Sequence, residues 1–151
     1  MLDSTDRRLL RLFQADPATP IAALAEAGRV SPGVAARRLE RMRDIGVLKG
    51  THAVIDWKAL GYTAEVSLRV TLEKSNPRAF DEFIAAARAI PEVIEIQTFL
   101  GRVDVRLSVI ARDMGHYQTI YRDAILTLPH IAEIEALMHV AEIKSAGVLP
   151  I

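Results

Sequence analysis

Apolar residues in the first fifty positions recur at the spacing of short helices, with polar residues between them. This pattern predicts two short helices, over residues 5–16 and 20–28. A third helix begins at Ser31–Pro32, because serine is a favoured N-cap and proline is favoured at the first helical position, and it runs to about Asp44. Two short helices, a tight turn and a third helix are the order of a helix-turn-helix domain.

The third predicted helix has one apolar face and one basic face. At about 100° per residue, its core-facing residues are Ala35, Leu39 and Met42. Arg37 and Arg41 lie within about 40° of each other on the far side, and Arg38 lies between the two faces. The positive charge of this helix is therefore directed outward.

The charge of the chain is unevenly distributed along its length. Residues 1–50 contain nine Lys and Arg against six Asp and Glu, and residues 51–151 contain ten against thirteen, so that +3 and −3 sum to zero. A basic half favours a polyanionic partner. One interpretation of the arginines is a solvated helix face, paired locally with Glu40 and Asp44. The arrangement of the helices favours double-stranded DNA, whose phosphates and base edges the arginines would contact in a major groove.

The remaining hundred residues predict the order β-α-β-β-α-β. The predicted strands are residues 65–73, 92–100, 103–110 and 131–144, and the predicted helices are residues 75–90 and 113–127. Similar stretches at 89–96 and 127–134 indicate two copies of one βαβ unit. This is a ferredoxin-like arrangement within an α+β chain. We expect its helices on one face of the sheet and apolar side chains on the other, which favours a sheet-to-sheet homodimer.

Several function classes fit the sequence poorly. The absence of cysteine excludes disulfides and thiolate metal sites. No apolar run approaches the roughly 18–20 residues needed to cross a bilayer, so we expect a cytoplasmic protein with no membrane partner. The sequence has no Gly-rich phosphate loop and no nucleophile elbow, and its four histidines lack the spacing of metal ligands. We therefore expect no cofactor, no metal and no enzymatic activity.

Five segments and one turn carry a resemblance to a known family. They are LDSTDRRLLRLFQAD (2–16), SPGVAARRLERMRDIGVLKG (31–50), AVIDWKALGY (53–62), IPEVIEI (90–96), IKSAGVLPI (143–151), and Gly101 with Asp104. In this order and spacing, the whole chain from residue 2 to residue 151 resembles the Lrp/AsnC (feast/famine) family of bacterial and archaeal transcription regulators.

The resemblance implies a two-domain regulator that acts as an oligomer. Residues 1–50 would form a winged helix-turn-helix DNA-binding domain, with an extended wing after the third helix. Residues 51–62 would form a linker strand, and residues 63–151 a ligand-sensing and oligomerisation domain. Family members dimerise and often assemble dimers into octamers. Small effectors, commonly amino acids, bind between dimers near the turn that joins the second and third strands.

The resemblance also implies which residues of this chain act at each site. The DNA-facing residues would be Ser31, Pro32, Gly33, Arg37, Arg38 and Arg41. The effector turn would contain Gly101, Arg102 and Asp104. That turn commonly reads Gly-Asp-Tyr-Asp in the family, whereas this chain has Gly-Arg-Val-Asp at residues 101–104. With fewer acceptors for a buried ammonium, either the effector is unusual or there is none.

Two alternatives share the same two-domain architecture. Some tetrapyrrole-pathway decarboxylases resemble it, and they would need a cluster of basic, His and Tyr residues around a large aromatic substrate. A sensing or assembly module with a vestigial DNA helix is the other alternative. The glycine and valine at residues 33–34 fit that alternative, and the intact arginine face argues against it.

Overall fold

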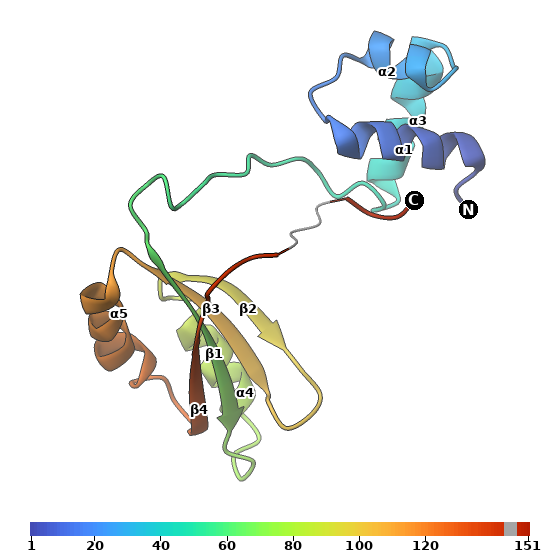
Figure 1. The fold of residues 1–151 in the computed structure, drawn as a ribbon. Coiled ribbons are helices and arrows are strands. Elements are labelled where there is room, and N and C mark those ends of the chain that lie inside the picture. Colours follow the sequence, from blue (N-terminus) through green and yellow to red (C-terminus); the bar gives the residue numbers. More distant parts are fainter. Residues whose placement is uncertain (144–147) are drawn as a thin grey trace. The chain divides into compact units, whose positions relative to one another are not determined.

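The computed structural model describes residues 1–143 and 148–151 and divides into two compact units. The first unit contains residues 1–54 together with 143–151, and the second contains residues 55–142. The elements in chain order are α1 (Ser4–Ala15), α2 (Ile21–Ala27), α3 (Pro32–Asp44), β1 (Ala64–Leu72), α4 (Ala79–Ala87), β2 (Val93–Thr98), β3 (Val105–Ala111), α5 (Met114–Ile120), the π-helical turn η1 (Tyr121–Ile125) and β4 (Ile131–Met138) (Figure 1). The predicted α+β class and order of elements are confirmed.

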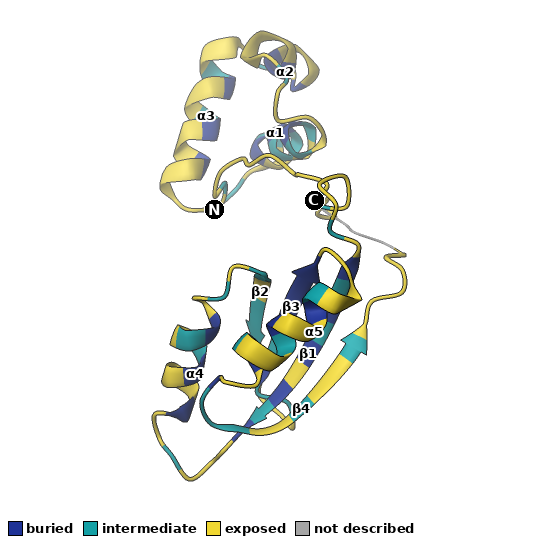
Figure 2. Cartoon of the chain, turned by 90° about the vertical axis from the view of Figure 1, so that its left-hand side faces the viewer, coloured by how far each residue is buried: buried dark blue, intermediate teal, exposed yellow. Residues whose placement is uncertain are grey.

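Three helices enclose the core of the first unit. Its buried side chains are Leu9, Phe13, Leu24, Ala25, Ala35, Leu39 and Met42. The predicted apolar stripe of α3 is therefore confirmed, and Figure 2 shows buried positions recurring along one side of that helix. Gly28 ends α2 at a close approach to α1, because a Cβ atom there would lie 2.6 Å from Leu9 Cδ2. The glycine is required for space and not for its backbone conformation.

The stretch that follows α3 differs from the prediction. Residues 47–62 contain turns and irregular backbone but no strand. The predictions of an extended wing and of a linker strand at 53–62 are therefore both wrong for the single chain. A strand is stable only beside another strand, whose edge satisfies its backbone N–H and C=O groups. An alternating sequence pattern favours extended backbone but does not provide that second strand. The apolar side chain of Val54 is 92% exposed here.

The last residues of the chain lie in the first unit, against α1. The side-chain amide of Gln14 donates to the Leu149 carbonyl at 3.0 Å and accepts from the Leu149 N–H at 2.9 Å. Arg11 Nε donates to the Ile151 carbonyl at 2.6 Å. The sequence assigned this tail to the sensing domain, whereas the structure groups it with the helical unit.

The second unit is a four-stranded antiparallel sheet in the order β2-β3-β1-β4. Its helices α4 and α5 contribute Phe83, Ala87, Tyr117 and Ile120 to a core shared with the inward side chains of β1 and β3. Two details differ from the prediction. β4 ends at Met138 and not near residue 144, which lies outside the described residues. Phe80 of α4 is exposed, although its spacing from Phe83 and Ala87 would place it on the apolar face of a regular helix.

The other face of this sheet is mainly polar, and the expected apolar side chains there are represented by Ile110 and Leu137. Its polar residues on the two central strands are Glu65, Ser67, Arg69, Thr71, Arg106 and Ser108. Arg69 pairs with Glu135 at 3.7 Å, and Arg106 pairs with Glu95 at 3.1 Å. The alternation in the sequence identifies the buried face correctly. The polar positions between those apolar ones make up the opposite face.

Candidate nucleic-acid interface

The first turn of α3 is built by its own sequence. Ser31 is the N-cap, and its hydroxyl accepts a hydrogen bond from the Val34 N–H at 3.4 Å. Pro32 occupies the first helical position, where its missing N–H costs nothing. Ser31, Pro32 and Gly33 are all exposed. The positive end of the α3 dipole is therefore accessible from solvent.

Four residues form the stripe of α3 that lies opposite the core. We call this the outer stripe, and its residues are Gly33, Arg37, Glu40 and Asp44. Their spacing of four, three and four residues places them within about 60° of one another on the helix. All four are exposed. The outer stripe therefore carries one cation followed by two carboxylates, with the cation nearer the N-terminus of the helix.

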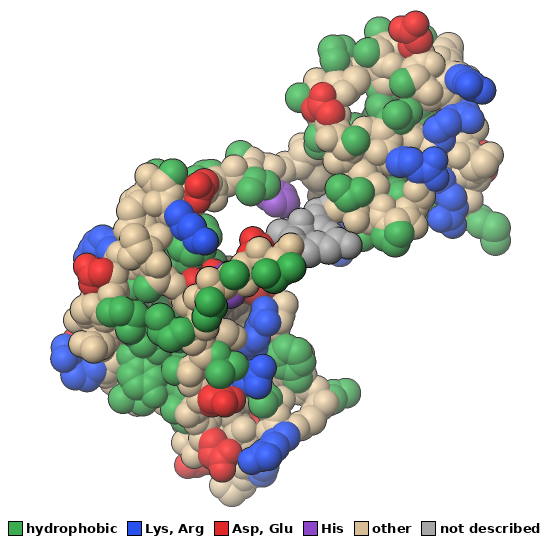
Figure 3. Space-filling model, viewed as in Figure 1, with side chains coloured by type: hydrophobic (Ala, Val, Ile, Leu, Met, Phe, Trp, Pro, Cys, Tyr) green, Lys and Arg blue, Asp and Glu red, His purple; other side chains and the backbone are tan. Residues whose placement is uncertain are grey.

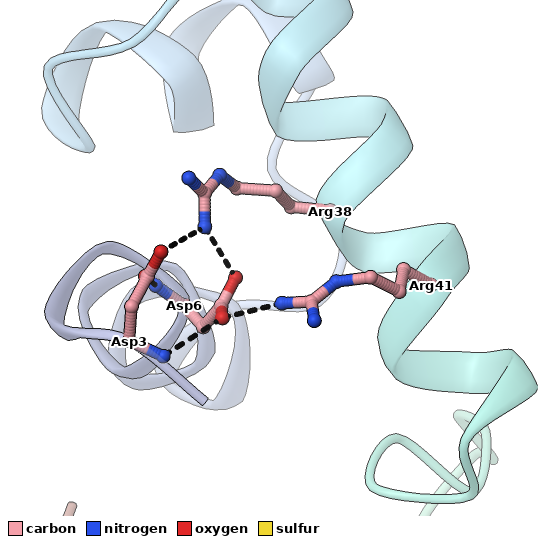
Figure 4. Close-up of polar contacts among 4 residues, drawn as sticks. All are labelled: Asp3, Asp6, Arg38 and Arg41. Carbon is pink, nitrogen blue, oxygen red and sulfur yellow. Dashed lines mark hydrogen bonds and ion pairs between the residues drawn. The ribbon is translucent and has the colours of Figure 1, made fainter. Parts of the chain in front are cut away.

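Two other arginines of α3 are held by carboxylates of α1 (Figure 4). Arg38 Nη1 lies 2.6 Å from Asp3 Oδ2 and 2.8 Å from Asp6 Oδ1, and Arg41 Nη2 lies 2.5 Å from Asp6 Oδ2. Asp3 and Asp6, the acidic pair of α1, also accept each other's backbone N–H in a capping box. The start of α1 and the middle of α3 are thus joined by one polar network.

Asp6 is the centre of this network and is fully buried. Burial alone would raise its pKa, because a buried carboxylate loses its hydration. The hydrogen bond from the Asp3 N–H and those from Arg38 and Arg41 outweigh burial and lower the pKa to about 2. Asp6 is therefore ionised at neutral pH, and it holds both guanidinium groups in fixed orientations.

The structure separates the predicted DNA-facing arginines into two kinds. Arg37 is exposed and has no ion pair within residues 1–143 and 148–151. Arg38 and Arg41 are bound to the acidic pair, although 27% and 44% of their side chains remain exposed. Figure 3 shows Lys and Arg side chains gathered along one side of the helical unit. The arginine partners of Asp6 are 32 and 35 residues away along the chain, so no local sequence pattern indicates this pairing.

The predicted effector turn is anchored to β1. Asp104 Oδ2 accepts a hydrogen bond from the Leu72 N–H at 2.8 Å, and Asp104 Oδ1 pairs with Lys74. The contact with Lys74 lowers the pKa of Asp104 most, and the hydrogen bond from the Leu72 N–H lowers it further. The Arg102 carbonyl accepts from the Thr71 hydroxyl at 3.0 Å. The carboxylate of Asp104 is thus engaged within the chain, where it fixes the turn.

A hollow of about 630 Å³ lies beside this turn. Its lining residues are Arg69, Thr71, Arg102, Val103, Glu133, Ile134 and Glu135. Of the three predicted effector residues, Arg102 is the one that lines it. The hollow presents two guanidinium groups and two carboxylates to a small molecule.

Both halves of the chain match known domain families. Residues 2–43 match the AsnC-type helix-turn-helix domain, and residues 65–149 match the Lrp/AsnC ligand binding domain. The chain belongs to the Lrp/AsnC family. It is thus a DNA-binding transcription regulator with a helix-turn-helix domain and a domain of the ligand-binding type, as the sequence predicted.

Named relatives match this chain over most of its length. The HTH-type transcriptional regulator Zrp of Zymomonas mobilis is 31% identical over 99% of this chain and 97% of its own. The proline dehydrogenase transcriptional activator of Rhodobacter capsulatus is 32% identical over 87% and 86%. A Neisseria meningitidis transcriptional regulator, solved as a complex with L-Met, superposes with a TM-score of 0.91 at 25% identity, over 99% and 97% of the two chains. The comparisons favour a regulator over the decarboxylase-like alternative.

Among the described residues, no three His, Asp or Glu side chains lie together in a way that could hold a metal ion. Within the same residues, every helix is too short or too polar to cross a bilayer.

Proposed function

We propose that this chain acts in the cytoplasm as a homodimer whose two α3 helices enter successive major grooves of a roughly palindromic DNA site. The observation that carries this proposal is the exposed, unpaired guanidinium of Arg37 on the outer stripe, as seen in the described part of the chain. A free guanidinium binds guanine O6 and N7, or a phosphate, in a bidentate manner. The match to the AsnC-type helix-turn-helix domain supports DNA as the partner.

The other predicted DNA-facing residues have supporting roles in this proposal. The Ser31 hydroxyl and the N-terminal backbone of α3, begun by Pro32, bind a phosphate at the positive end of the helix dipole. Gly33 allows close approach of the helix, since nothing lies within 4 Å of where its Cβ would be. Arg38 and Arg41 contact the phosphate backbone with the donors that the acidic pair leaves free.

An effector binds, in this proposal, in the hollow beside the 101–104 turn. A zwitterionic amino acid carries one anion and one cation. Arg69 and Arg102 suit its carboxylate, and Glu133 and Glu135 suit its ammonium group. The L-Met complex of the Neisseria relative supports this choice of ligand class. Effector binding acts by changing how dimers assemble, and not by contact with DNA.

Self-association is supported by apolar residues left uncovered in the second unit. Ile55, Met138 and Val140 are all exposed at its two ends. Large apolar side chains exposed in one chain become buried when a second copy covers them. Analytical ultracentrifugation of the parent and of Val140→Lys, with and without a panel of amino acids, tests this part. A parent that sediments as a monomer at micromolar concentration would contradict it.

The DNA-binding proposal is tested by fluorescence anisotropy of the full chain on a duplex from upstream of its own gene, beside a scrambled duplex. Arg37→Ala is expected to weaken binding about 5- to 100-fold, and Arg88→Ala, an exposed arginine of the second unit, serves as the matched control. Arg41→Ala is a poorer test because it also removes a partner of Asp6. Equal affinity of Arg37→Ala and the parent across a salt series would refute the proposal.

A further inference from the structure

Glu40 is an exposed carboxylate on the outer stripe of α3. Arg37 and Arg43 lie three residues before and after it, at the spacing of local helix pairs. Even so, Glu40 forms no ion pair with any residue that the structure describes. Local pairing, as in an ordinary solvated helix face, therefore does not account for this side chain.

A carboxylate on a DNA-facing helix is repelled by phosphates unless it meets a hydrogen-bond donor. In the major groove the donors are the N4 amino group of cytosine and the N6 amino group of adenine. Adenine also presents its N7 acceptor beside N6, and two acceptors repel each other. Guanine and thymine present acceptors there. The carboxylate of Glu40 at a base edge therefore favours cytosine over the other three bases.

We propose, resting on the DNA-binding function above, that Glu40 is a specificity-determining residue that accepts a hydrogen bond from cytosine N4. Arg37 precedes it by three residues, which is about 4.5 Å along the helix axis. Successive base pairs are about 3.4 Å apart. Arg37 and Glu40 thus read adjacent base pairs, a guanine and a cytosine, in each half-site.

Asp44 provides a control on the same helix. It belongs to the same outer stripe, carries the same charge and lies about 6 Å further toward the C-terminus of α3. Asp44 is the last residue of α3 and thus the one furthest from the N-terminal residues that contact base edges in helix-turn-helix proteins. Removing the charge of Asp44 therefore reduces repulsion from phosphates without altering base preference.

The experiment selects bound duplexes from a library with a randomised 24-base-pair core, using the full-length parent, Glu40→Gln and Asp44→Asn. The parent is expected to enrich a two-fold motif with a conserved cytosine in each half. Glu40→Gln is expected to replace that cytosine by adenine, because a glutamine amide pairs with adenine N6 and N7. On the parent's selected site, Glu40→Gln should bind about 5- to 100-fold more weakly. Asp44→Asn should keep the parent's motif.

The outcomes separate this proposal from the function on which it rests. If both variants enrich the parent's motif and bind all duplexes more tightly, the reading role of Glu40 is wrong and DNA binding stands. If the parent enriches no motif, sequence-specific DNA binding itself is wrong. Thermal unfolding checks that the variants are folded. Glu40→Ala is a second variant, and it should lose the preference for cytosine without acquiring a preference for another base.

Discussion

Replacing Asp6 by asparagine removes the charge at the centre of the α1–α3 network while keeping the size of the side chain. The pKa of Asp6 falls from 3.8 to about 2 on folding. At 1.36 kcal/mol per pKa unit, this corresponds to about 2.5 kcal/mol of stability at pH 7. Asp6 is fully buried, but the side chains of Arg38 and Arg41 are partly exposed, so solvent screening makes this figure an upper value. We expect Asp6→Asn to lower the free energy of unfolding of the helical unit by up to that amount.

The pH dependence gives a second, independent test of the same reasoning. Because the folded pKa lies below the unfolded value, the stabilisation is complete above about pH 4 and is lost as the pH falls toward 2. Urea unfolding followed by circular dichroism at 222 nm measures the difference between parent and Asp6→Asn at each pH. Glu26→Gln, an exposed acid on α2, is the control and should change stability by less than about 0.5 kcal/mol. A difference in the free energy of unfolding between parent and Asp6→Asn that is below about 0.5 kcal/mol at pH 7 would refute this reasoning. A difference that stays constant down to pH 2.5 would refute it as well.

Three further substitutions test other parts of the structure. Gly28→Ala should destabilise the helical unit by about 1–3 kcal/mol in urea titrations, because the new Cβ meets Leu9 in the core, and an unchanged midpoint would contradict that close approach. At Gly33, a helical residue, an added Cβ would meet nothing within 4 Å, so Gly33→Ala should stabilise the same unit by about 0.4–1 kcal/mol. A loss of stability would count against the helical assignment of this residue. Asp104→Asn should lower the free energy of unfolding of the second unit by about 1–2 kcal/mol above pH 4 and should have no effect well below that pH. The reason is that the contacts that lower the pKa of Asp104 stabilise only its ionised form. Urea unfolding followed by Trp57 fluorescence measures the difference at each pH. A loss that is equal at pH 7 and at pH 2.5 would show that the charge is not responsible.

Local signals in the sequence were sufficient for most of the fold. Serine and proline at residues 31–32 locate the start of α3, and its apolar period identifies Ala35, Leu39 and Met42 as core. Alternation identifies the buried face of β1 in the same way. These features depend on residues that are close together in the chain, so the physics of capping and periodicity applies directly.

The features that were missed depend on residues far apart in the chain. Asp6 has the appearance of a helix-end carboxylate in sequence, and its pairing with Arg38 and Arg41 requires α1 and α3 to pack first. The same network binds Arg38 and Arg41 and leaves Arg37 without an ion pair among the described residues. The angular positions of these arginines on the helix do not reveal this difference. The segment at 53–62 has the pattern of a strand but no neighbouring edge within the described chain.

The contact of the C-terminal tail with Gln14 makes the second unit an insertion within the first. The polypeptide passes between the units twice, once at residues 54–55 and once at residues 142–143. The first passage leads into β1 and the second follows β4, and these two strands are hydrogen-bonded neighbours. The first unit is therefore complete only after the whole second unit has been synthesised, because Leu149 and Ile151, which bind α1, follow residues 55–142 in the chain.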